Sequence, residues 1–250
     1  MKVSIITVSY NSDETIRDTI ESVARQSYNN IEYIVVDGNS KDETMAIVSS
    51  YASSIDKVVS EPDKGIYDAM NKGVQLATGD IVGILNSDDF YETDTIIEDI
   101  VEHFKQHENV DMVFGDVVFV EPSNLSKVVR YYSSAKFKSY KLRFGWMPPH
   151  PATFIKKKVY DKYGLYKLGY KISADYEIFV RLLMVAKLKF SRIDKVIVRM
   201  RSGGASTGGI QSSITLNKEI VKACKENNIY TNFFIVILKM PFKLLEMIKR

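Results

Sequence analysis

The stretch Gly83-Ile84-Leu85-Asn86-Ser87-Asp88-Asp89-Phe90 indicates both the fold and the place of a functional site. The apolar run 81–85 has the length and composition of a strand that is buried on both faces. Two carboxylates follow it, and open α/β sheets bind ligands at the carboxyl ends of their strands. Adjacent carboxylates repel each other unless a cation or hydrogen-bond donors lie between them. Asp88 and Asp89 therefore predict a divalent-metal site with oxygen ligands. The alternative is an ordinary solvated loop before the next helix.

Length and composition fit a globular protein with one large domain or two small ones. The chain has 250 residues, of which 45% are apolar, which is enough for a substantial core. Its net charge of +3 gives no overall attraction to nucleic acid. The single cysteine, Cys224, excludes an intrachain disulfide and fits a reducing compartment. We expect neither a signal peptide nor a transmembrane helix, because no apolar stretch reaches about 20 residues.

Strands and helices alternate over the first half of the chain. Strands are expected over 3–8, 31–36, 57–59 and 79–85, and helices over 16–24, 43–50, 66–76 and 95–106. Asn11, Ser40 and Thr95 each precede a glutamate by three residues, which predicts capping boxes at helix starts. Such alternation predicts an α/β fold with a mostly parallel central sheet flanked by helices and joined by right-handed crossovers.

Polar side chains follow several of these strands. Tyr10, Asp37, Asp63 and the Asp88–Asp89 pair lie at strand ends or just beyond them. The carboxyl ends of parallel strands meet at one edge of a sheet, so these residues are expected to share one rim. Residues 9–14 contain no glycine, so the Gly-x-Gly-x-x-Gly of a Rossmann dehydrogenase is absent, and so is a Walker loop. A metal, rather than a glycine-rich cradle, is expected to hold the ligand's phosphates.

Five motifs in a fixed order make a family resemblance specific. They lie at 7–11 (Thr-Val-Ser-Tyr-Asn), 35–44, 61–73, 86–89 (Asn-Ser-Asp-Asp) and 173–177. Over roughly residues 1–200 the chain resembles a family 2 glycosyltransferase of the kind that builds bacterial surface polysaccharides. This resemblance implies the GT-A fold, which binds nucleotide-sugars. The Gln-x-x-Arg-Trp motif of processive synthases does not occur, so the resemblance implies transfer of a single sugar.

The resemblance also implies roles for residues of the donor site. Tyr10 corresponds to the aromatic that stacks on the nucleobase, and Asp37 to the acid that accepts a hydrogen bond from the base, expected to be uracil. Asp88 corresponds to a carboxylate that faces ribose or the donor sugar, and Asp89 to the ligand of Mg²⁺ or Mn²⁺ at the diphosphate. Four further residues of these motifs are candidates for donor contacts: Thr7, Asp63, Lys64 and Asp68. For Asp68 the alternative is a helix N-terminal acid that interacts with the helix dipole.

The reaction requires a base on another element. Displacing a nucleoside diphosphate leaves negative charge that a metal neutralises, while the attacking hydroxyl needs a general base. Asp175 matches the family's catalytic position, although the family often has Glu-Asp where this chain has Ala174-Asp175. The alternatives are that Asp175 only interacts with the helix dipole, or that Glu177 is the base. Membership of the family implies inversion at the anomeric carbon.

Acceptor-side candidates lie later in the chain. The family commonly has His-Gln where this chain has His150-Pro151, and His150 is expected to contact diphosphate, acceptor or metal unless it is structural. Residues 127–144 are basic and aromatic, which fits a diphosphate-linked acceptor or plain surface charge. Beyond a strand over 190–200, Arg199 or Arg201 could reach the diphosphate if the glycine-rich loop 203–209 closes as a lid. The alternative is a flexible connection to a helix over 211–226.

The expected organisation is one GT-A catalytic domain at 1–200, with a donor half at about 1–110 and an acceptor half at about 111–200. Residues 201–250 then form the lid and a helical C-terminal extension. Within it, residues 232–250 combine Phe, Ile, Leu and Met with spaced cations, which predicts a helix lying in a membrane interface. Packing against the domain and a dimer contact are the alternatives.

The expected enzyme is a hexosyl- or N-acetylhexosaminyltransferase that uses a UDP-linked donor and Mn²⁺ or Mg²⁺. Its expected acceptor is a glycan or a polyprenyl-diphosphate-linked glycan, at the cytoplasmic membrane's inner face. Two other classes stay open. A sugar-phosphate nucleotidyltransferase would need a glycine-rich basic loop after the first strand, and an inactive glycan-binding module would not need the intact carboxylates.

Overall fold

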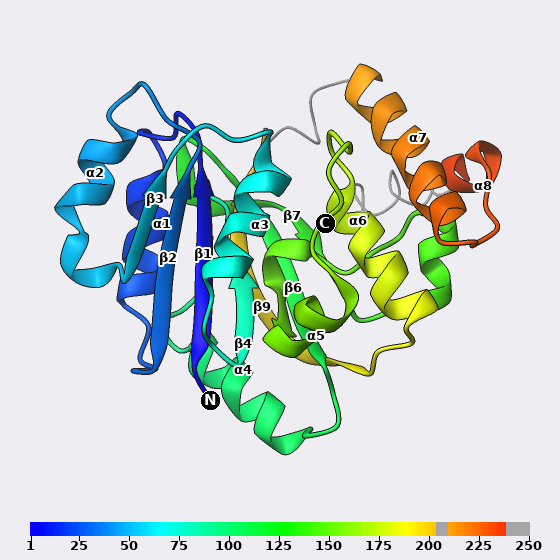
Figure 1. Cartoon of the computed structure of the whole chain (residues 1–250), viewed down its shortest axis with the longest axis horizontal. Coiled ribbons are helices and arrows are strands. Elements are labelled where there is room, and N and C mark those ends of the chain that lie inside the picture. The colour runs from blue at the N-terminus through cyan, green and yellow to red at the C-terminus, as the bar shows by residue number, and fades with distance from the viewer. Residues whose placement is uncertain (204–209, 239–250) are drawn as a thin grey trace.

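One nine-stranded sheet organises the fold (Figure 1). The computed structural model describes residues 1–203 and 210–238. The strands follow the order β3-β2-β1-β4-β8-β6-β9-β5, and β7 pairs with β6. They are β1 (Val3–Ser9), β2 (Ile31–Asp37), β3 (Lys57–Ser60), β4 (Ile81–Ile84), β5 (Asp89–Tyr91), β6 (Met112–Glu121), β7 (Asn124–Tyr132), β8 (Thr153–Lys156) and β9 (Phe190–Arg201).

Helices cover both faces of the sheet. The α-helices are α1 (Ile16–Ala24), α2 (Thr44–Ser50), α3 (Ile66–Leu76), α4 (Ile96–Gln106), α5 (Lys157–Tyr163), α6 (Ala174–Phe179), α7 (Ile210–Glu226) and α8 (Phe233–Ile237). The other helical segments are the 3₁₀-helices η1 (Ala52–Ser54), η2 (Ser139–Phe144) and η3 (His150–Ala152) and the π-helix η4 (Val180–Val185). The helices over 16–24, 66–76 and 95–106 therefore form as the apolar spacing predicts.

The core has two layers because side chains alternate across each strand. In β1, Ile6 and Val8 belong to the cluster that includes residues of α3, α6 and α7. Val3 and Ile5 belong to the opposite cluster, with residues of α1 and α4. Both faces of the strand are buried, which confirms the interpretation of the continuous apolar runs.

The strands β3, β2, β1 and β4 run parallel, as predicted, and this part of the sheet places the site. Ser9 pairs with Asp37 and Ile6 with Ile84, so these strands end at a common rim. The rest of the sheet is mixed, because β8 runs antiparallel to both β4 and β6. Asp89 opens the short strand β5 instead of standing in a loop, and this strand pairs with β9.

The predicted capping boxes are wrong. Helices α1, α2 and α4 begin without a side-chain cap, at N-caps Thr15, Glu43 and Thr95. Asn11 instead accepts a hydrogen bond from the Lys41 backbone N–H at 2.9 Å. Ser40 donates its hydroxyl to Asp37 at 2.5 Å. These polar residues are used to tie the loops after β1 and β2 together, not to start helices.

The C-terminal extension packs on the body of the fold through α7 and α8. The predicted lid at 203–209 lies, apart from Gly203, outside the described residues, and so does the tail from residue 239 onward. Over residues 1–203 and 210–238, no helix is both long and apolar enough to cross a bilayer.

Candidate functional site

A cavity of about 1020 Å³ opens at the carboxyl ends of β1, β2 and β4. Its walls come from the loops after these strands, from the start of α3, and from three segments of the second half of the chain. Seven of the eleven predicted site residues line it: Tyr10, Asp63, Asp88, Asp89, His150, Asp175 and Arg201. The predicted rim therefore exists, and later segments complete it.

The other four predicted residues do not line the cavity. Thr7 is fully buried, and its hydroxyl shares a hydrogen bond with Tyr33 at 3.0 Å. The Asp68 carboxylate accepts the backbone N–H of Lys64 at 3.0 Å, within the turn that starts α3. Lys64 is exposed.

Asp37, the fourth, lies beneath the cavity floor. It is fully buried, and four donors surround its carboxylate: the hydroxyls of Ser9, Ser40 and Ser60 and the backbone N–H of Ser40. Four hydrogen bonds satisfy the acceptor capacity of a carboxylate. A ligand would reach Asp37 only by displacing one of these donors.

One end of the cavity offers a flat surface beside an acid. The Tyr10 side chain is 63% exposed there, although aromatic rings are usually more buried. A Cβ atom at Gly38 would lie 2.6 Å from Asp63 Oδ2 and 3.3 Å from Tyr10 Cδ2. Only glycine therefore lets the backbone, the ring and the carboxylate approach this closely.

The Asp88–Asp89 pair lines the cavity and has unmet hydrogen-bonding capacity. Asp89 is 1% exposed, and Asn86 donates to its Oδ2 at 3.1 Å. The oxygens Asp89 Oδ1 and Asn86 Oδ1 are buried without a partner. Burial, followed by the charge of Asp88, raises the pKa of Asp89 well above its usual range. Burial also raises the pKa of Asp88.

Arg201 provides the positive charge nearest this pair. Its Nη1 donates to the backbone carbonyl of Asp88 at 2.7 Å, and its guanidinium pairs with Asp18 and lies over the Phe90 ring. Arg199, the other candidate, instead forms a two-pronged ion pair with Glu92 at 2.6 and 2.8 Å. Arg199 and Arg201 lie two residues apart on β9 but have different partners, and of the two only Arg201 lines the cavity.

Asp175 lies on the wall formed by α6. Its Oδ1 accepts the Tyr176 backbone N–H at 2.8 Å. The Tyr67 hydroxyl donates to the Ile172 carbonyl at 2.5 Å and makes a longer contact of 3.3 Å with the same Asp175 oxygen. Burial raises the pKa of Asp175 to about 6. The alternative, Glu177, is fully buried and paired with Arg181 and Lys167, so it does not face the cavity.

His150 is a buried, neutral contact on the same wall. Burial lowers the pKa of His150 to about 4, so the ring is uncharged at pH 7. Its Nε2 lies 2.8 Å from the Tyr166 hydroxyl. The Tyr166 ring stacks on that of Tyr67 with centroids 6.1 Å apart, and Tyr67 contacts Asp175. A tyrosine network thus connects the histidine with the acid.

Sequence reasoning missed Tyr67, Tyr166 and Glu219. Tyr67 lies within a quoted motif, so a strand-end rule extended to the first helical turn could have found it. Glu219 comes from α7 and accepts the backbone N–H groups of residues 171–173 at 2.7 to 3.0 Å. Nothing in the sequence links it to that loop.

The residues described fit a metal only together with a ligand. Within 1–203 and 210–238, no group of three or more His, Cys, Asp or Glu side chains could hold an ion. The unpartnered oxygens of Asp89 and Asn86 nevertheless suit a hard cation, since an unpaired buried acceptor costs about 1–3 kcal/mol. A diphosphate would supply the remaining ligands.

The comparisons with known proteins decide the family. The family model for glycosyl transferase family 2 matches residues 4–165. The chain belongs to glycosyl transferase family 2. A PGL/p-HBAD biosynthesis glycosyltransferase of Mycobacterium bovis is 30% identical over 223 residues, which is 88% of this chain and 82% of that relative. An uncharacterized glycosyltransferase of Mycobacterium tuberculosis is 33% identical over 74% of this chain and 70% of its own length.

Solved structures of other proteins share the fold. Residues 1–349 of S. aureus TarS in complex with UDP-GlcNAc match with a TM-score of 0.69 at 17% identity, over 96% of this chain and 72% of that one. A longer TarS structure is matched over 39% of its length. Mannosyltransferase PcManGT from Pyrobaculum calidifontis, in complex with GDP-Man and Mn²⁺, matches with a TM-score of 0.66 at 16% identity. This match covers 99% of this chain and 73% of PcManGT. The chain therefore has the predicted α/β GT-A fold with C-terminal helices.

Proposed function

We propose that this glycosyltransferase transfers one sugar, with inversion, from a UDP-linked donor to a hydroxyl of a glycan or of a polyprenyl-diphosphate-linked glycan. The observation that carries the proposal is that one cavity contains both an acidic pair with an unpartnered oxygen and a separate acid with a pKa of about 6. The Asp88–Asp89 pair fits a diphosphate with a bound cation, and Asp175, the separate acid, fits the role of a general base.

The donor half, about residues 1–110, binds the nucleotide in this proposal. Tyr10 stacks on the uracil, and Gly38 leaves room for it beside Asp63. Asp37 contacts the base once a serine hydroxyl gives way, and Asp88 contacts ribose or the donor sugar. Thr7, Lys64 and Asp68 support the surrounding loops instead of touching the donor. The bound nucleotides of the TarS and PcManGT structures support a nucleotide-sugar as the ligand class.

Asp89 and Asn86 are the residues that would hold Mn²⁺ or Mg²⁺. When bound, the ion neutralises the charge that develops on the leaving diphosphate. Arg201, which lines the same region, adds a fixed positive charge. His150 is uncharged, so it orients an acceptor or phosphate oxygen by hydrogen bonding without adding charge.

Asp175 is the proposed general base. Both hydrogen bonds to its carboxylate reach Oδ1, so Oδ2 is the oxygen that takes the proton of the attacking hydroxyl. Tyr67 and the Tyr176 backbone hold the carboxylate in a fixed orientation. A pKa of about 6 leaves Asp175 mostly ionised at pH 7 while keeping it more basic than a solvated aspartate.

The acceptor half, about residues 111–200, is proposed to select the acceptor in surface-polysaccharide synthesis. A lipid-linked acceptor would place the enzyme on the inner face of the bacterial cytoplasmic membrane. The transferred group is proposed to be a hexosyl or N-acetylhexosaminyl unit. The mycobacterial relative of 30% identity is a PGL/p-HBAD biosynthesis glycosyltransferase, which supports sugar transfer in a biosynthetic pathway.

A panel of nucleotide-sugars tests the function. Thermal unfolding with Mn²⁺ and UDP-, GDP- or dTDP-sugars should show stabilisation by one class, about 2.7 kcal/mol at 100 times its dissociation constant. The stabilising donor should then release its nucleoside diphosphate on turnover. Stabilisation by a nucleoside triphosphate with a sugar 1-phosphate, and release of pyrophosphate, would favour a nucleotidyltransferase. Binding without any turnover would favour an inactive binding module.

A further inference from the structure

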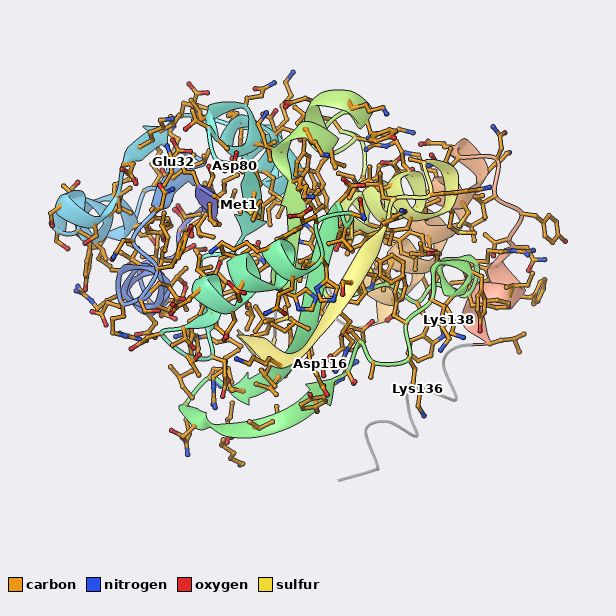
Figure 2. The ribbon with its side chains drawn as sticks, turned by 90° about the horizontal axis from the view of Figure 1, so that it is seen from below. Met1, Glu32, Asp80, Asp116, Lys136 and Lys138 are labelled. Carbon is orange, nitrogen blue, oxygen red and sulfur yellow. The ribbon has the colours of Figure 1, made fainter. Side chains whose placement is uncertain are left out.

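Two segments far apart in the sequence form one surface beside α7. Residues 136–144, which include η2, lie against residues 230–238, which include α8 (Figures 1 and 2). Arg143 Nε donates to the carbonyl of Tyr230 at 3.1 Å, and the Thr231 hydroxyl donates to the carbonyl of Arg143 at 2.6 Å. We call these two segments the η2–α8 surface.

The η2–α8 surface exposes large apolar side chains. In α8 only Val236 is fully buried, so the helix turns its other apolar residues outward. Aromatic and aliphatic side chains of this size are normally inside a protein. Five of them are well exposed here: Phe234 by 81%, Tyr230 by 70%, Leu238 by 64%, Tyr140 by 55% and Phe144 by 40%.

The same surface is basic and lacks acids. Residues 122–160 contain no Asp or Glu, and residues 227–238 contain no charged residue. Lys136, Lys138 and Lys141 form no ion pair within the described chain, whereas Lys127 and Lys158 pair with acids. Figure 2 shows Lys136 and Lys138 on the side of the molecule where η2 and α8 meet.

We propose that the η2–α8 surface docks on a bilayer that contains anionic lipid. Exposed aromatic and aliphatic residues flanked by unpaired cations suit the boundary between headgroups and acyl chains. A protein partner fits less well, because lysines are depleted in protein interfaces. The sequence beyond residue 238 contains four cations and one acid. This inference deepens the proposed function, since it names the membrane-facing surface that a lipid-linked acceptor would require.

Vesicle flotation of the full chain tests the proposal. Vesicles would contain phosphatidylcholine alone or with 30% phosphatidylglycerol. One variant combines Lys136→Gln, Lys138→Gln and Lys141→Gln, and its control combines Lys105→Gln, Lys127→Gln and Lys158→Gln, which remove the same charge elsewhere. A second variant combines Phe234→Ser and Leu238→Ser, and its control combines Val58→Ser and Val185→Ser, which replace exposed apolar residues elsewhere. UDP binding, measured in parallel, reports on the donor site independently of the membrane.

The unaltered chain should bind anionic vesicles and bind neutral ones much more weakly. The surface lysine variant should lose about 100-fold in partitioning, on the scale of a factor of about five per cation, while its control loses far less. The Phe234–Leu238 variant should also be released. Equal binding by the surface variants and their controls would overturn the proposal, and so would absent vesicle binding by the unaltered chain. Conversion of a dimer to monomers by the surface variants, without vesicle binding, would assign the surface to self-association instead.

Discussion

At the scale of single residues, Asp175 combines the two properties that a general base needs. Its carboxylate is held at one oxygen by Tyr67 and by the Tyr176 N–H, and burial raises its pKa to about 6. Asp89 differs in that its unpartnered oxygen, Oδ1, is also fully buried. The two acids therefore have different surroundings within one cavity, which fits the proton-accepting role proposed for Asp175 and the cation-binding role proposed for Asp89.

Replacing Asp175 tests the base. Asp175→Asn keeps the side chain's shape and removes its basicity, so turnover should fall by about 10²–10⁴-fold while donor affinity stays unchanged. Asp194→Asn, an exposed acid on β9, is the control. Single-turnover kinetics and donor titration would measure the two effects separately. Near-normal turnover in Asp175→Asn would show that another group takes the proton.

The substitution Gly38→Ala tests whether the nucleotide binds between Tyr10 and Asp63. A methyl group at position 38 would lie 2.6 Å from Asp63 Oδ2 and 3.3 Å from the Tyr10 ring, so both side chains must shift. Gly38→Ala should therefore weaken UDP binding by about tenfold or more, in line with overpacking costs of about 1–3 kcal/mol. Calorimetric titration of UDP measures this. Unchanged UDP affinity in a folded variant would mean that the nucleotide does not lie between Tyr10 and Asp63.

At the scale of elements, Glu32 lies near the start of β2, on the same side as Met1 and Asp80 (Figure 2). The cavity lies at the other end of this strand. The Glu32 carboxylate accepts hydrogen bonds of 2.5 to 3.1 Å from the side chains of Lys2, Ser4 and Lys57 and from the Thr78 backbone N–H. These bonds tie β1 and β3 to the turn before β4. Burial acts to raise the pKa of Glu32, but these hydrogen bonds outweigh it and hold the pKa well below the usual range. The ionised form is therefore the stabilising one.

Urea unfolding of Glu32→Gln at two pH values tests this tie. A group with a depressed pKa stabilises the fold above its unfolded pKa and loses that contribution as pH falls toward its folded pKa. At pH 7 the variant should lose about 2–3 kcal/mol of unfolding free energy. The difference from the unaltered chain should shrink at pH 3. An equal loss at both pH values would show that the charge of Glu32 does not matter.

Elements that carry a strong apolar pattern could be predicted from the sequence, and those that depend on distant partners could not. The buried runs of β1, β2 and β4 and the spacing in α3 give the parallel half of the sheet and its rim. The short strands β5 and β8 are stable only because β9, β4 and β6 pair with them, so their own residues give little signal. The capping boxes predicted at Asn11 and Ser40 were wrong, because a short polar side chain can hydrogen-bond either a helix start or a neighbouring loop.

The residues of the candidate site also differ in how well the sequence predicts them. Tyr10, Asp63, Asp88 and Asp89 follow strands and could be placed by topology alone. Asp175 and His150 depended on the family resemblance, since their segments reach the cavity through tertiary packing. Asp37 was expected at the ligand, but three serines from separate segments enclose it. The contact of Glu219 with the loop before Asp175 could not be predicted from the sequence, because its partners are backbone amides about 46 residues earlier.

At the scale of the whole molecule, the C-terminal extension supports the catalytic wall. Glu219 of α7 accepts the backbone N–H groups of Lys171, Ile172 and Ser173, directly before Asp175. After burial and its hydrogen bonds, the negative charge of Glu219 is a further influence that raises the pKa of Asp175. The extension therefore supports the wall that carries Asp175 and adds a small contribution to the rise in the pKa of Asp175.

The pH dependence of kcat tests this coupling. A base must be ionised, so kcat should rise with pH through about 6 in the unaltered enzyme. Glu219→Gln removes a neighbouring negative charge, so the midpoint should move to lower pH. Glu226→Gln, on the same helix but bonded to Tyr170, is the control and should leave the midpoint in place. A midpoint that Glu219→Gln does not move would remove Glu219 from the pH behaviour of Asp175.

The most direct test of the account is calorimetric titration of UDP with and without Mn²⁺ in the unaltered chain and in Asp89→Ala. The unpartnered oxygen of Asp89 should bind the cation that joins the chain to the diphosphate. Mn²⁺ should therefore strengthen UDP binding by at least about tenfold, or 1.4 kcal/mol. Asp89→Ala should lose this increment and keep the metal-free affinity. If Asp89→Ala binds UDP in Mn²⁺ as tightly as the unaltered chain, Asp89 does not hold the metal and the proposed site is wrong.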